Sequence, residues 1–344
     1  MNRFRSAIFS NNILRKYILK QLLSRVSQAQ FKILTTAFIL LIMSSNYTVA
    51  QLTYKELKVQ YDSPWTFKNL QVIPVRYKAG EGSPTVGHTP GQHPISLSEA
   101  LEKHKIKLQE MQYEKGADVN WLQLTNHSKQ DVVVQSGEIL DGGKQDRMVG
   151  ETKVIAAGST DYINVFCVEK RRWSDKPKEF KTAGVANSEL QKTMNTKRRQ
   201  SDVWKEIDRQ FAINDKKSDT YSYLELYNNT IRDDSDYMRF FLKKYSETDS
   251  VFAGYIFITD NRIISTELFA TAELTNISFK NMLKTYIQTA RSSGAPPKVS
   301  TARVTTFMDK VLLNEAAQKI YVTAHGKLQV SDGKVIHLVA YDDQ

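Results

Sequence analysis

Apolar and polar residues alternate along much of the chain between residues 52 and 175. A period of two is typical of strands, because successive side chains of a strand point to opposite faces. We therefore expect strands over residues 67–77, 119–125, 131–135, 153–156 and 161–168. Turn residues such as Asp141-Gly142-Gly143 separate these runs. Short strands at this spacing predict a β-rich N-terminal half built as a sandwich or a small barrel.

One helix is expected inside this β-rich part, beginning at Ser96. Glu99 follows Ser96 by three residues, which is the spacing of a capping box. An apolar stripe continues through residue 111 and is formed by Ala100, Leu101, Ile106 and Leu108. Residues 110–114 are interpreted as the end of this helix.

The hydrophobic period becomes helical after residue 186. Helices are expected over residues 190–211, 221–231 and 238–245. The last part of the chain is mixed. Its expected elements are a hairpin of residues 252–259 and 262–270 around Asp260-Asn261, helices over 277–291 and 301–317, and a meander over 319–341 with turns at Gly326 and Asp332-Gly333.

This order of elements predicts an α+β fold in a single domain, residues 51–344. Its expected sub-regions are β-rich over residues 52–175, helical over 186–247 and α+β over 250–344.

The first fifty residues have the composition of an export signal. They contain seven Lys and Arg residues and no acidic residue, followed by the apolar run 33–43 and by Thr48-Val49-Ala50. A basic region, a short apolar region and a small residue at the cut predict a signal peptide, cleaved between Ala50 and Gln51. The mature chain is then periplasmic or secreted, with no membrane span. An uncleaved anchor or a misassigned start codon stays open as an alternative.

Charge and cysteine content limit the possible partners. The net charge is +11, but the signal region supplies +7 of it, which leaves +4 for the rest of the chain. This small excess of basic residues predicts no binding of nucleic acid. Cys167 is the one cysteine of the chain. It cannot form an internal disulfide. The residue directly after the predicted cut is Gln51 and not a cysteine, so no lipid anchor is expected. Cys167 lies in an apolar strand, which predicts a small buried side chain.

The densest group of charged and polar residues lies between residues 137 and 173. Such groups near a sheet either face water or build a site, because burying a polar group without a partner costs several kcal/mol per group. Arginine and lysine are suited to a phosphate or a carboxylate, and tryptophan can stack on a base or a sugar ring. The candidate ligand-binding residues are therefore Lys144, Gln145, Arg147, Arg172 and Trp173.

Glu138 and Glu169 are the catalytic candidates in this segment, as acid or base. A structural alternative stays open, in which Glu138 pairs with Arg147, Glu169 pairs with Arg172, and Trp173 covers the core. The function hypotheses require the residues after Gly143 to meet those after Cys167 in space.

The segment resembles a known family through two motifs. The first is Gly137-Glu138-x-Leu140-x-Gly142-x-Lys144-Gln145-x-Arg147, and the second is Cys167-Val168-Glu169-x-x-Arg172-Trp173. They are similar to the core of the ARG-and-Rhodanese-Phosphatase-superfamily-associated protein domain family, in which ARG stands for ADP-ribosylglycohydrolase. The likeness extends over most of the mature chain, to the Phe269 segment and Val335-Ile336-His337-Leu338. Family members are expected to carry Asn at position 146 and Gly at position 171. The resemblance implies association with ADP-ribose- and phosphate-handling proteins, and no particular activity.

Other patterns predict neither a metal nor a cofactor. His88 and His93 lie close in sequence, but no cysteine and no acid of the same turn accompanies them. His337 is expected to point inward and to be hydrogen-bonded. The chain contains no Walker A loop, GxGxxG, GxSxG or HExxH motif.

Three function hypotheses remain. The first is an exported binding domain for a small anionic or nucleotide-like ligand at residues 137–173. The second is a hydrolase or transferase acting on ADP-ribose- or phosphate-containing molecules. The third is a structural module of the cell envelope, which would expose a large apolar patch.

Overall fold

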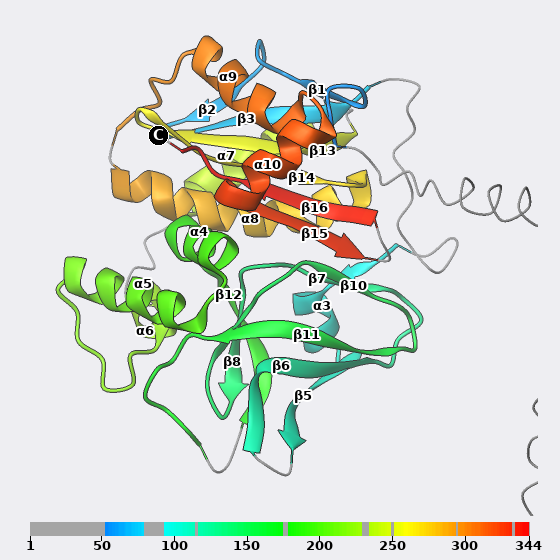
Figure 1. The fold of residues 1–344 in the computed structure, drawn as a ribbon, viewed down its shortest axis with the longest axis vertical. Coiled ribbons are helices and arrows are strands. Elements are labelled where there is room, and N and C mark those ends of the chain that lie inside the picture. The colour runs from blue at the N-terminus through cyan, green and yellow to red at the C-terminus, as the bar shows by residue number, and fades with distance from the viewer. Residues whose placement is uncertain are drawn as a thin grey trace, which may run out of the picture. The chain divides into compact units, whose positions relative to one another are not determined.

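Strands from both ends of the chain form one antiparallel sheet (Figure 1). The computed structural model describes residues 52–78, 93–113, 116–174, 178–228, 234–248, 251–293, 295–331 and 334–343. Within them, seven strands belong to this sheet, in the order β1-β3-β13-β14-β16-β15, with β2 paired to β3. Their bounds are β1 Leu57–Val59, β2 Trp65–Phe67, β3 Leu70–Tyr77, β13 Phe252–Thr259, β14 Arg262–Phe269, β15 Gly326–Ser331 and β16 Lys334–Ala340.

Helices cover both faces of this sheet, which explains why its central strands β13 and β14 are buried at every position except Arg262 at the start of β14. One face packs against α9 and α10, where Phe307, Val311 and Val322 share an apolar cluster with Ile256 of the sheet. The other face packs against α7 and α8. The bounds of the four helices are α7 Ser235–Ser246, α8 Ala272–Ser293, α9 Thr301–Leu312 and α10 Glu315–His325.

The motif segment lies in a second β-rich region. A six-stranded sheet has the order β12-β8-β9-β11-β6-β5, and a three-stranded sheet has the order β10-β7-β4 among the described residues. A shared apolar cluster, including Leu124, Val134 and Ile163, joins the two sheets. The bounds are β4 Ile95–Ser96, α3 Leu97–Glu102, β5 Ile106–Tyr113, β6 Gly116–Asn126, β7 Val132–Val134, β8 Glu138–Gly143, β9 Arg147–Val149, β10 Lys153–Ile155, β11 Thr160–Cys167 and β12 Lys178–Val185.

Three helices cover β8 and β9 of this sheet. They are α4 Ser188–Lys197, α5 Gln200–Ile213 and α6 Tyr223–Asn228. Ile139 of β8 and Met148 of β9 pack with Leu190, Val203 and Ile207 of the helices. The charged turn between β8 and β9 is therefore attached to a strongly apolar support.

The α+β fold predicted from the sequence is confirmed, with mixed hairpins and helices in the C-terminal part. The Ser96 cap is also confirmed, since its side chain accepts a hydrogen bond from the Glu99 backbone N–H. The strands expected at 119–125, 131–135, 153–156 and 161–168 correspond to β6, β7, β10 and β11.

Several expected boundaries are wrong. The helix after Ser96 ends at Glu102, and residues 106–113 form strand β5 instead of its second half. The helix expected over 190–211 is two helices, because Arg198 takes a left-handed conformation, φ 58°, between α4 and α5.

The C-terminal boundaries differ in the same way. Asn314 caps a new helix, so residues 301–317 are not one helix, and residues 319–325 belong to α10 instead of the meander. The N-terminal strands β1, β2 and β3 pair with the C-terminal sheet and not with the strands that carry the motif.

Other expectations fall outside the described residues. These are the signal peptide, His88, the helix residues 229–231 and the turn at Asp332-Gly333. None of the helices in the described part of the chain is long and apolar enough to cross a membrane.

Candidate functional site

The turn from β8 to β9 depends on two glycines. Gly142 has φ +130° and Gly143 has φ +57°, both in the region that favours glycine. A Cβ atom at position 142 would lie 2.5 Å from the backbone oxygen of Glu179 in β12. The glycines therefore allow β8 to approach β12 closely. The turn then brings Arg147 of β9 opposite Cys167 of β11.

Replacing Gly142 by Ala is expected to destabilise the protein more than replacing Gly158 by Ala. Gly158 also has a positive φ, +67°, but no atom lies within 4 Å of a Cβ placed there. Gly158→Ala therefore tests the backbone conformation separately, at about 1 kcal/mol. Gly142→Ala adds the clash with Glu179, and we expect a loss of about 2 kcal/mol in the free energy of unfolding in urea. Equal losses would show that the close approach has no energetic weight.

The segment after Cys167 is held between the glycine turn and the chain before α6. The Val168 backbone N–H donates to the backbone carbonyl oxygen of Asp146 at 3.1 Å, and the Ser174 backbone N–H donates to that of Lys144 at 3.1 Å. On the other side, the Arg171 N–H donates to the Thr220 oxygen at 2.9 Å. The two motifs of the sequence are therefore neighbours in space, as expected.

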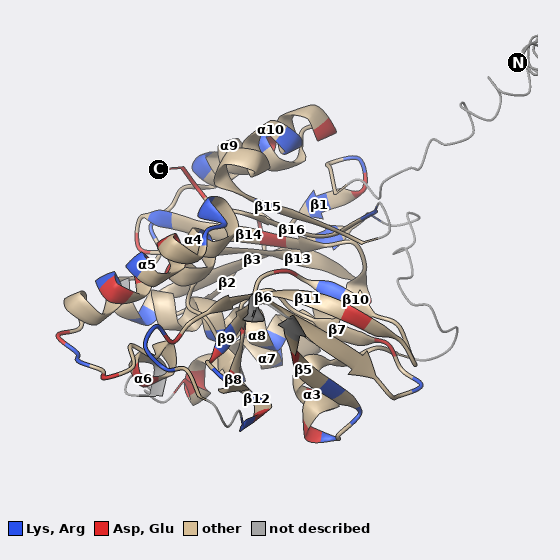
Figure 2. Cartoon of the chain, turned by 60° about the horizontal axis from the view of Figure 1, so that its bottom comes forward, with Lys and Arg blue, Asp and Glu red and all other residues tan. Residues whose placement is uncertain are grey.

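Behind this contact lies a group of charged side chains, which we call the inner ion cluster. It consists of Glu110, Asp146, Arg147, Glu169 and Arg172. Its four members other than Arg172 are largely or fully buried. Residues of both signs lie next to each other around β8 and β9 (Figure 2). Every charge of the cluster has a partner of opposite sign within it.

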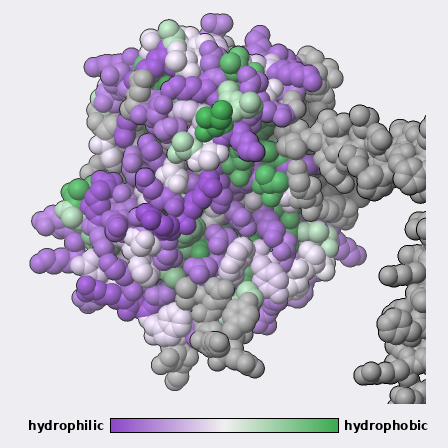
Figure 3. Space-filling model, viewed as in Figure 1, coloured by the Kyte–Doolittle hydropathy of each residue, from purple (hydrophilic) through white to green (hydrophobic). Residues whose placement is uncertain are grey.

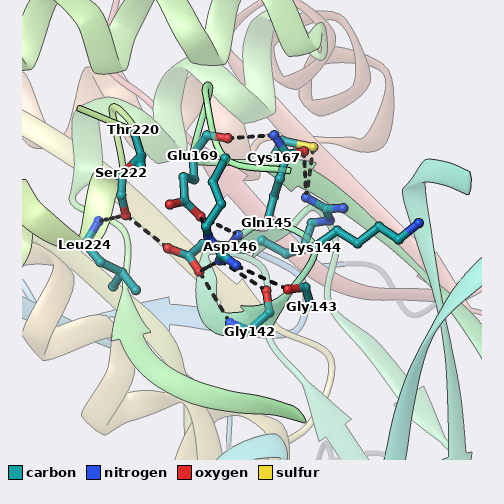
Figure 4. Close-up of polar contacts among 12 residues, drawn as sticks. Gly142, Gly143, Lys144, Gln145, Asp146, Cys167, Glu169, Thr220, Ser222 and Leu224 are labelled. Carbon is teal, nitrogen blue, oxygen red and sulfur yellow. Dashed lines mark hydrogen bonds and ion pairs between the residues drawn. The ribbon is translucent and has the colours of Figure 1, made fainter. Parts of the chain in front are cut away.

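One half of the inner ion cluster joins two carboxylates through Arg172. The guanidinium donates from Nη2 to Asp146 Oδ1 at 2.8 Å and from Nε to Glu169 Oε2 at 2.5 Å. Ser222 and the Gly142 backbone N–H also donate to Asp146 (Figure 4). Burial, and then the charge of Glu169, raises the pKa of Asp146 to about 6. The Glu169–Arg172 pair of the structural hypothesis is thus present.

The other half pairs Arg147 with Glu110. Arg147 Nη2 lies 3.2 Å from Glu110 Oε1, and Nη1 donates to Gln145 Oε1 at 3.3 Å and to Cys167 Sγ at 3.1 Å. Arg147 is only 1 % exposed. The structural hypothesis paired Arg147 with Glu138, and this pairing is wrong. Glu110 was missed because residues 106–111 were assigned to a helix, although their alternation of Ile, Lys, Leu, Gln and Glu indicates a strand.

Glu138 lies in a separate environment. Its carboxylate accepts hydrogen bonds from the Gln135 backbone N–H at 2.8 Å and from Asn281 Nδ2 of α8 at 3.2 Å. Burial raises the pKa of Glu138 to about 7, although these hydrogen bonds and the charge of Lys284 oppose the shift. Its hydrogen-bond partners differ from those of Glu169, so the two catalytic candidates do not share a hydrogen-bonded site.

Four residues form the outer edge of the motif, which we call the motif rim. They are Lys144, Arg171, Trp173 and Tyr221. Trp173 is 49 % exposed and therefore does not cover the core, contrary to the structural hypothesis. Lys144 extends away from the inner ion cluster (Figure 4), and its Nζ lies 4.9 Å from the centre of the Trp173 ring. The Arg171 guanidinium lies 4.4 Å from the centre of the Tyr221 ring.

A model of the ARG and Rhodanese-Phosphatase-superfamily-associated Protein domain family matches residues 58–341. The chain belongs to this family. No curated protein and no solved structure matches it. The family name links its members to ADP-ribosylglycohydrolase and to rhodanese-phosphatase proteins, without naming an activity.

Positions 146 and 171, where family members are expected to carry other residues, lie at different depths of the site. Asp146, expected as Asn, is buried in the inner ion cluster and accepts from Arg172 and Ser222. Arg171, expected as Gly, is exposed on the motif rim. The first position therefore belongs to the buried ion cluster and the second to the exposed rim.

The cysteine and histidines considered from the sequence have surroundings that fit a structural role. Burial raises the pKa of the Cys167 thiol although Arg147 opposes the shift, so the reactive thiolate is disfavoured. His337 is buried, as expected, between Thr152 Oγ1 at 3.0 Å and Glu267 Oε2 at 3.1 Å. His93 is exposed and contacts Glu273. The described residues contain no group of three side chains suited to a metal.

Proposed function

We propose that this chain is a binding domain for a small anionic ligand that carries a flat ring, such as a nucleotide-like or ADP-ribose-related molecule. The observation that supports it best is the exposed Trp173 ring with the Lys144 ammonium above it. An aromatic ring can stack on a base, and a neighbouring cation can pair with a phosphate. The family name, which includes ADP-ribosylglycohydrolase, points to the same class of ligand.

The inner ion cluster supports the motif rim in this proposal and does not contact the ligand. Gln145 and Arg147 are buried and hydrogen-bonded to the protein. Arg172 is about a quarter exposed, but its guanidinium already binds Asp146 and Glu169. Of the five ligand-binding candidates, Lys144 and Trp173 are therefore the two that we assign to direct contact. A rigid support favours affinity, because less side-chain freedom is lost on binding.

Two neighbouring cations extend the rim toward α6. Arg171 lies over Tyr221, and Lys170 Nζ lies 6.0 Å from the same ring while pairing with Asp208 at 2.8 Å. A ligand with two phosphates would reach from Lys144 toward Arg171, since one backbone segment holds both ends of the rim. Export through the expected signal peptide is part of the proposal and places such a ligand outside the cytoplasm.

A hydrolase or transferase is less well supported. Glu138 has the raised pKa of an acid that could exchange a proton near neutral pH. However, it is fully enclosed, and Glu169 is held by Arg172. A catalytic carboxylate must reach the atom that it protonates.

Replacing Trp173 by Ala is expected to weaken the binding of ADP-ribose to the full-length chain by about 5- to 150-fold, the effect of losing one stacked base. Isothermal titration calorimetry measures the dissociation constant. Lys144→Met should weaken ADP-ribose more than adenosine, because only the former carries phosphate.

The matched control is Trp121→Ala, since Trp121 is also exposed, at 37 %, on strand β6. It should leave the affinity unchanged. Absence of saturable binding to ADP-ribose, AMP and adenosine, or equal affinity of the Trp173→Ala variant and the wild type, would refute the proposal.

A further inference from the structure

A cavity of about 440 Å³ lies between the helices that cover β8 and the C-terminal end of α8. We call it the helix pocket. Asn187 and Glu189 line it from the start of α4, Arg209 and Gln210 from α5, and Thr289 and Arg291 from α8. Its volume falls within the range of small-molecule sites, about 300–1,000 Å³. Lys144 and Trp173 of the motif rim are not among its lining residues.

Among the described residues, three guanidiniums and two carboxylates line the helix pocket, and each guanidinium has a carboxylate partner in the lining or directly behind it. Arg209 is held by both carboxylate oxygens of Glu206, at 2.6 and 2.8 Å. Arg262, at the start of β14, lies 3.4 Å from Glu189 Oε1, and Arg291 pairs with Asp234. Because each guanidinium has a carboxylate partner, a ligand with a net charge would meet repulsion as well as attraction here.

The pocket wall is rich in groups that both donate and accept hydrogen bonds. Asn187 Nδ2 donates to Gln210 Oε1 at 2.8 Å, and the Asn187 backbone N–H donates to the Tyr223 hydroxyl at 2.8 Å. The side-chain bond, together with the Leu190 backbone N–H that donates to Asn187 Oδ1 at 3.0 Å, fixes the orientation of both amides. Gln288 and Thr289 face the same space from α8. The surface over α4 and α5 is mostly hydrophilic (Figure 3), in keeping with a polar ligand.

Hydroxyl groups match this arrangement better than other common groups. Each hydroxyl has one donor and two acceptor lone pairs, whereas a carboxylate only accepts and a guanidinium only donates. Two neighbouring hydroxyls can therefore donate to Glu189 while they accept from Arg262. The hydrogen bond between Glu189 and Arg262 themselves is long, at 3.4 Å, and therefore weak. Leu226 and Ile213 add apolar surface for the carbon side of a ring.

We propose that the helix pocket binds an uncharged, hydroxyl-rich ligand of one or two sugar rings. The site is separate from the motif rim and does not depend on the function proposed there. Its specificity comes from guanidinium–carboxylate pairs and fixed amides, and its selectivity against charged sugars comes from the carboxylate that already neutralises each guanidinium.

The test uses the full-length chain and calorimetric titration with glucose, N-acetylglucosamine and maltose, beside glucuronate and glucose 6-phosphate. At least one neutral sugar should bind saturably and more tightly than the charged sugars. Arg262→Met removes one guanidinium, and Asn214→Trp fills the cavity from an exposed position at the end of α5. Each variant should weaken binding by about tenfold or more.

Arg239→Met is the matched control. Arg239 forms a similar exposed pair, with Asp236 at 3.3 Å, on α7 and does not line the pocket. It should bind like the wild type, and a thermal melt verifies that all variants fold. The inference is overturned if no neutral sugar binds, if only charged sugars bind, or if folded Arg262→Met and Asn214→Trp variants keep the wild-type affinity. Trp173→Ala should leave sugar binding unchanged, which separates this site from the motif rim.

Discussion

Replacing Arg147 by Met is expected to lower the free energy of unfolding by about 3–5 kcal/mol. The substitution removes the cation that faces Glu110 and leaves a buried carboxylate without its ion-pair partner. It also removes hydrogen bonds to Gln145 and Cys167. Urea denaturation of the full-length chain, followed by circular dichroism, measures the change.

A double variant separates the uncompensated charge from the loss of packing. In Arg147→Met/Glu110→Gln the carboxylate is absent as well, so the protein should regain much of the lost stability. Lys103→Met is the surface control, because the Lys103–Glu99 pair is exposed. It should cost less than about 1 kcal/mol. If the double variant is no more stable than Arg147→Met, the unpaired Glu110 is not the cause.

Replacing Glu138 by Gln is expected to change the pH dependence of stability. Folding raises the pKa of this carboxyl from 4.5 to about 7, because the side chain is buried. The folded chain therefore binds the proton more tightly than the unfolded chain, and stability is lost as the pH rises from about 4.5 through about 7. A shift of this size corresponds to about 3 kcal/mol. Glutamine resembles the protonated carboxyl and removes this loss.

The measurement is the free energy of unfolding of both proteins at pH 5 and pH 8. The advantage of Glu138→Gln over the wild type should grow by about 2.5 kcal/mol between the two pH values, because part of the effect is already lost at pH 5. Asp141→Asn is the matched control, since Asp141 is exposed on the same strand β8. A difference between Glu138→Gln and the wild type that stays constant with pH would contradict the burial of an ionisable Glu138. Asp146, whose pKa is also raised, is present in both proteins and cancels in the comparison.

The fold class, several strands and the meeting of the two motifs were predictable from the sequence. Alternation in residues 161–168 identified β11, and the Ser96–Glu99 spacing identified the cap of α3. These signals are local, so neighbouring residues suffice to determine them. The two motifs were also expected to meet, and the contacts of Val168 with Asp146 and of Ser174 with Lys144 show that they do.

Boundaries were less predictable where strand and helix patterns resemble each other. Residues 106–111 continue the apolar stripe of α3, but pairing with β6 makes them a strand. A short apolar run fits both periods, and pairing with β6, whose partner residues are 7 to 20 positions away in sequence, decides between them. The break at Arg198 lies in residues 195–202, which contain no apolar residue, so hydrophobic periodicity could not place it.

The amino-acid sequence by itself determined the α+β class, the main strands and which segment carries the dense charges. Tertiary structure alone decided that Glu110 pairs with Arg147, that Glu138 is isolated beside Asn281, and that Trp173 is exposed. It also decided that β1–β3 join strands near the other end of the chain. The reason is physical: secondary structure follows from local periodicity, whereas the partner and the burial of a charge depend on which distant elements pack against it.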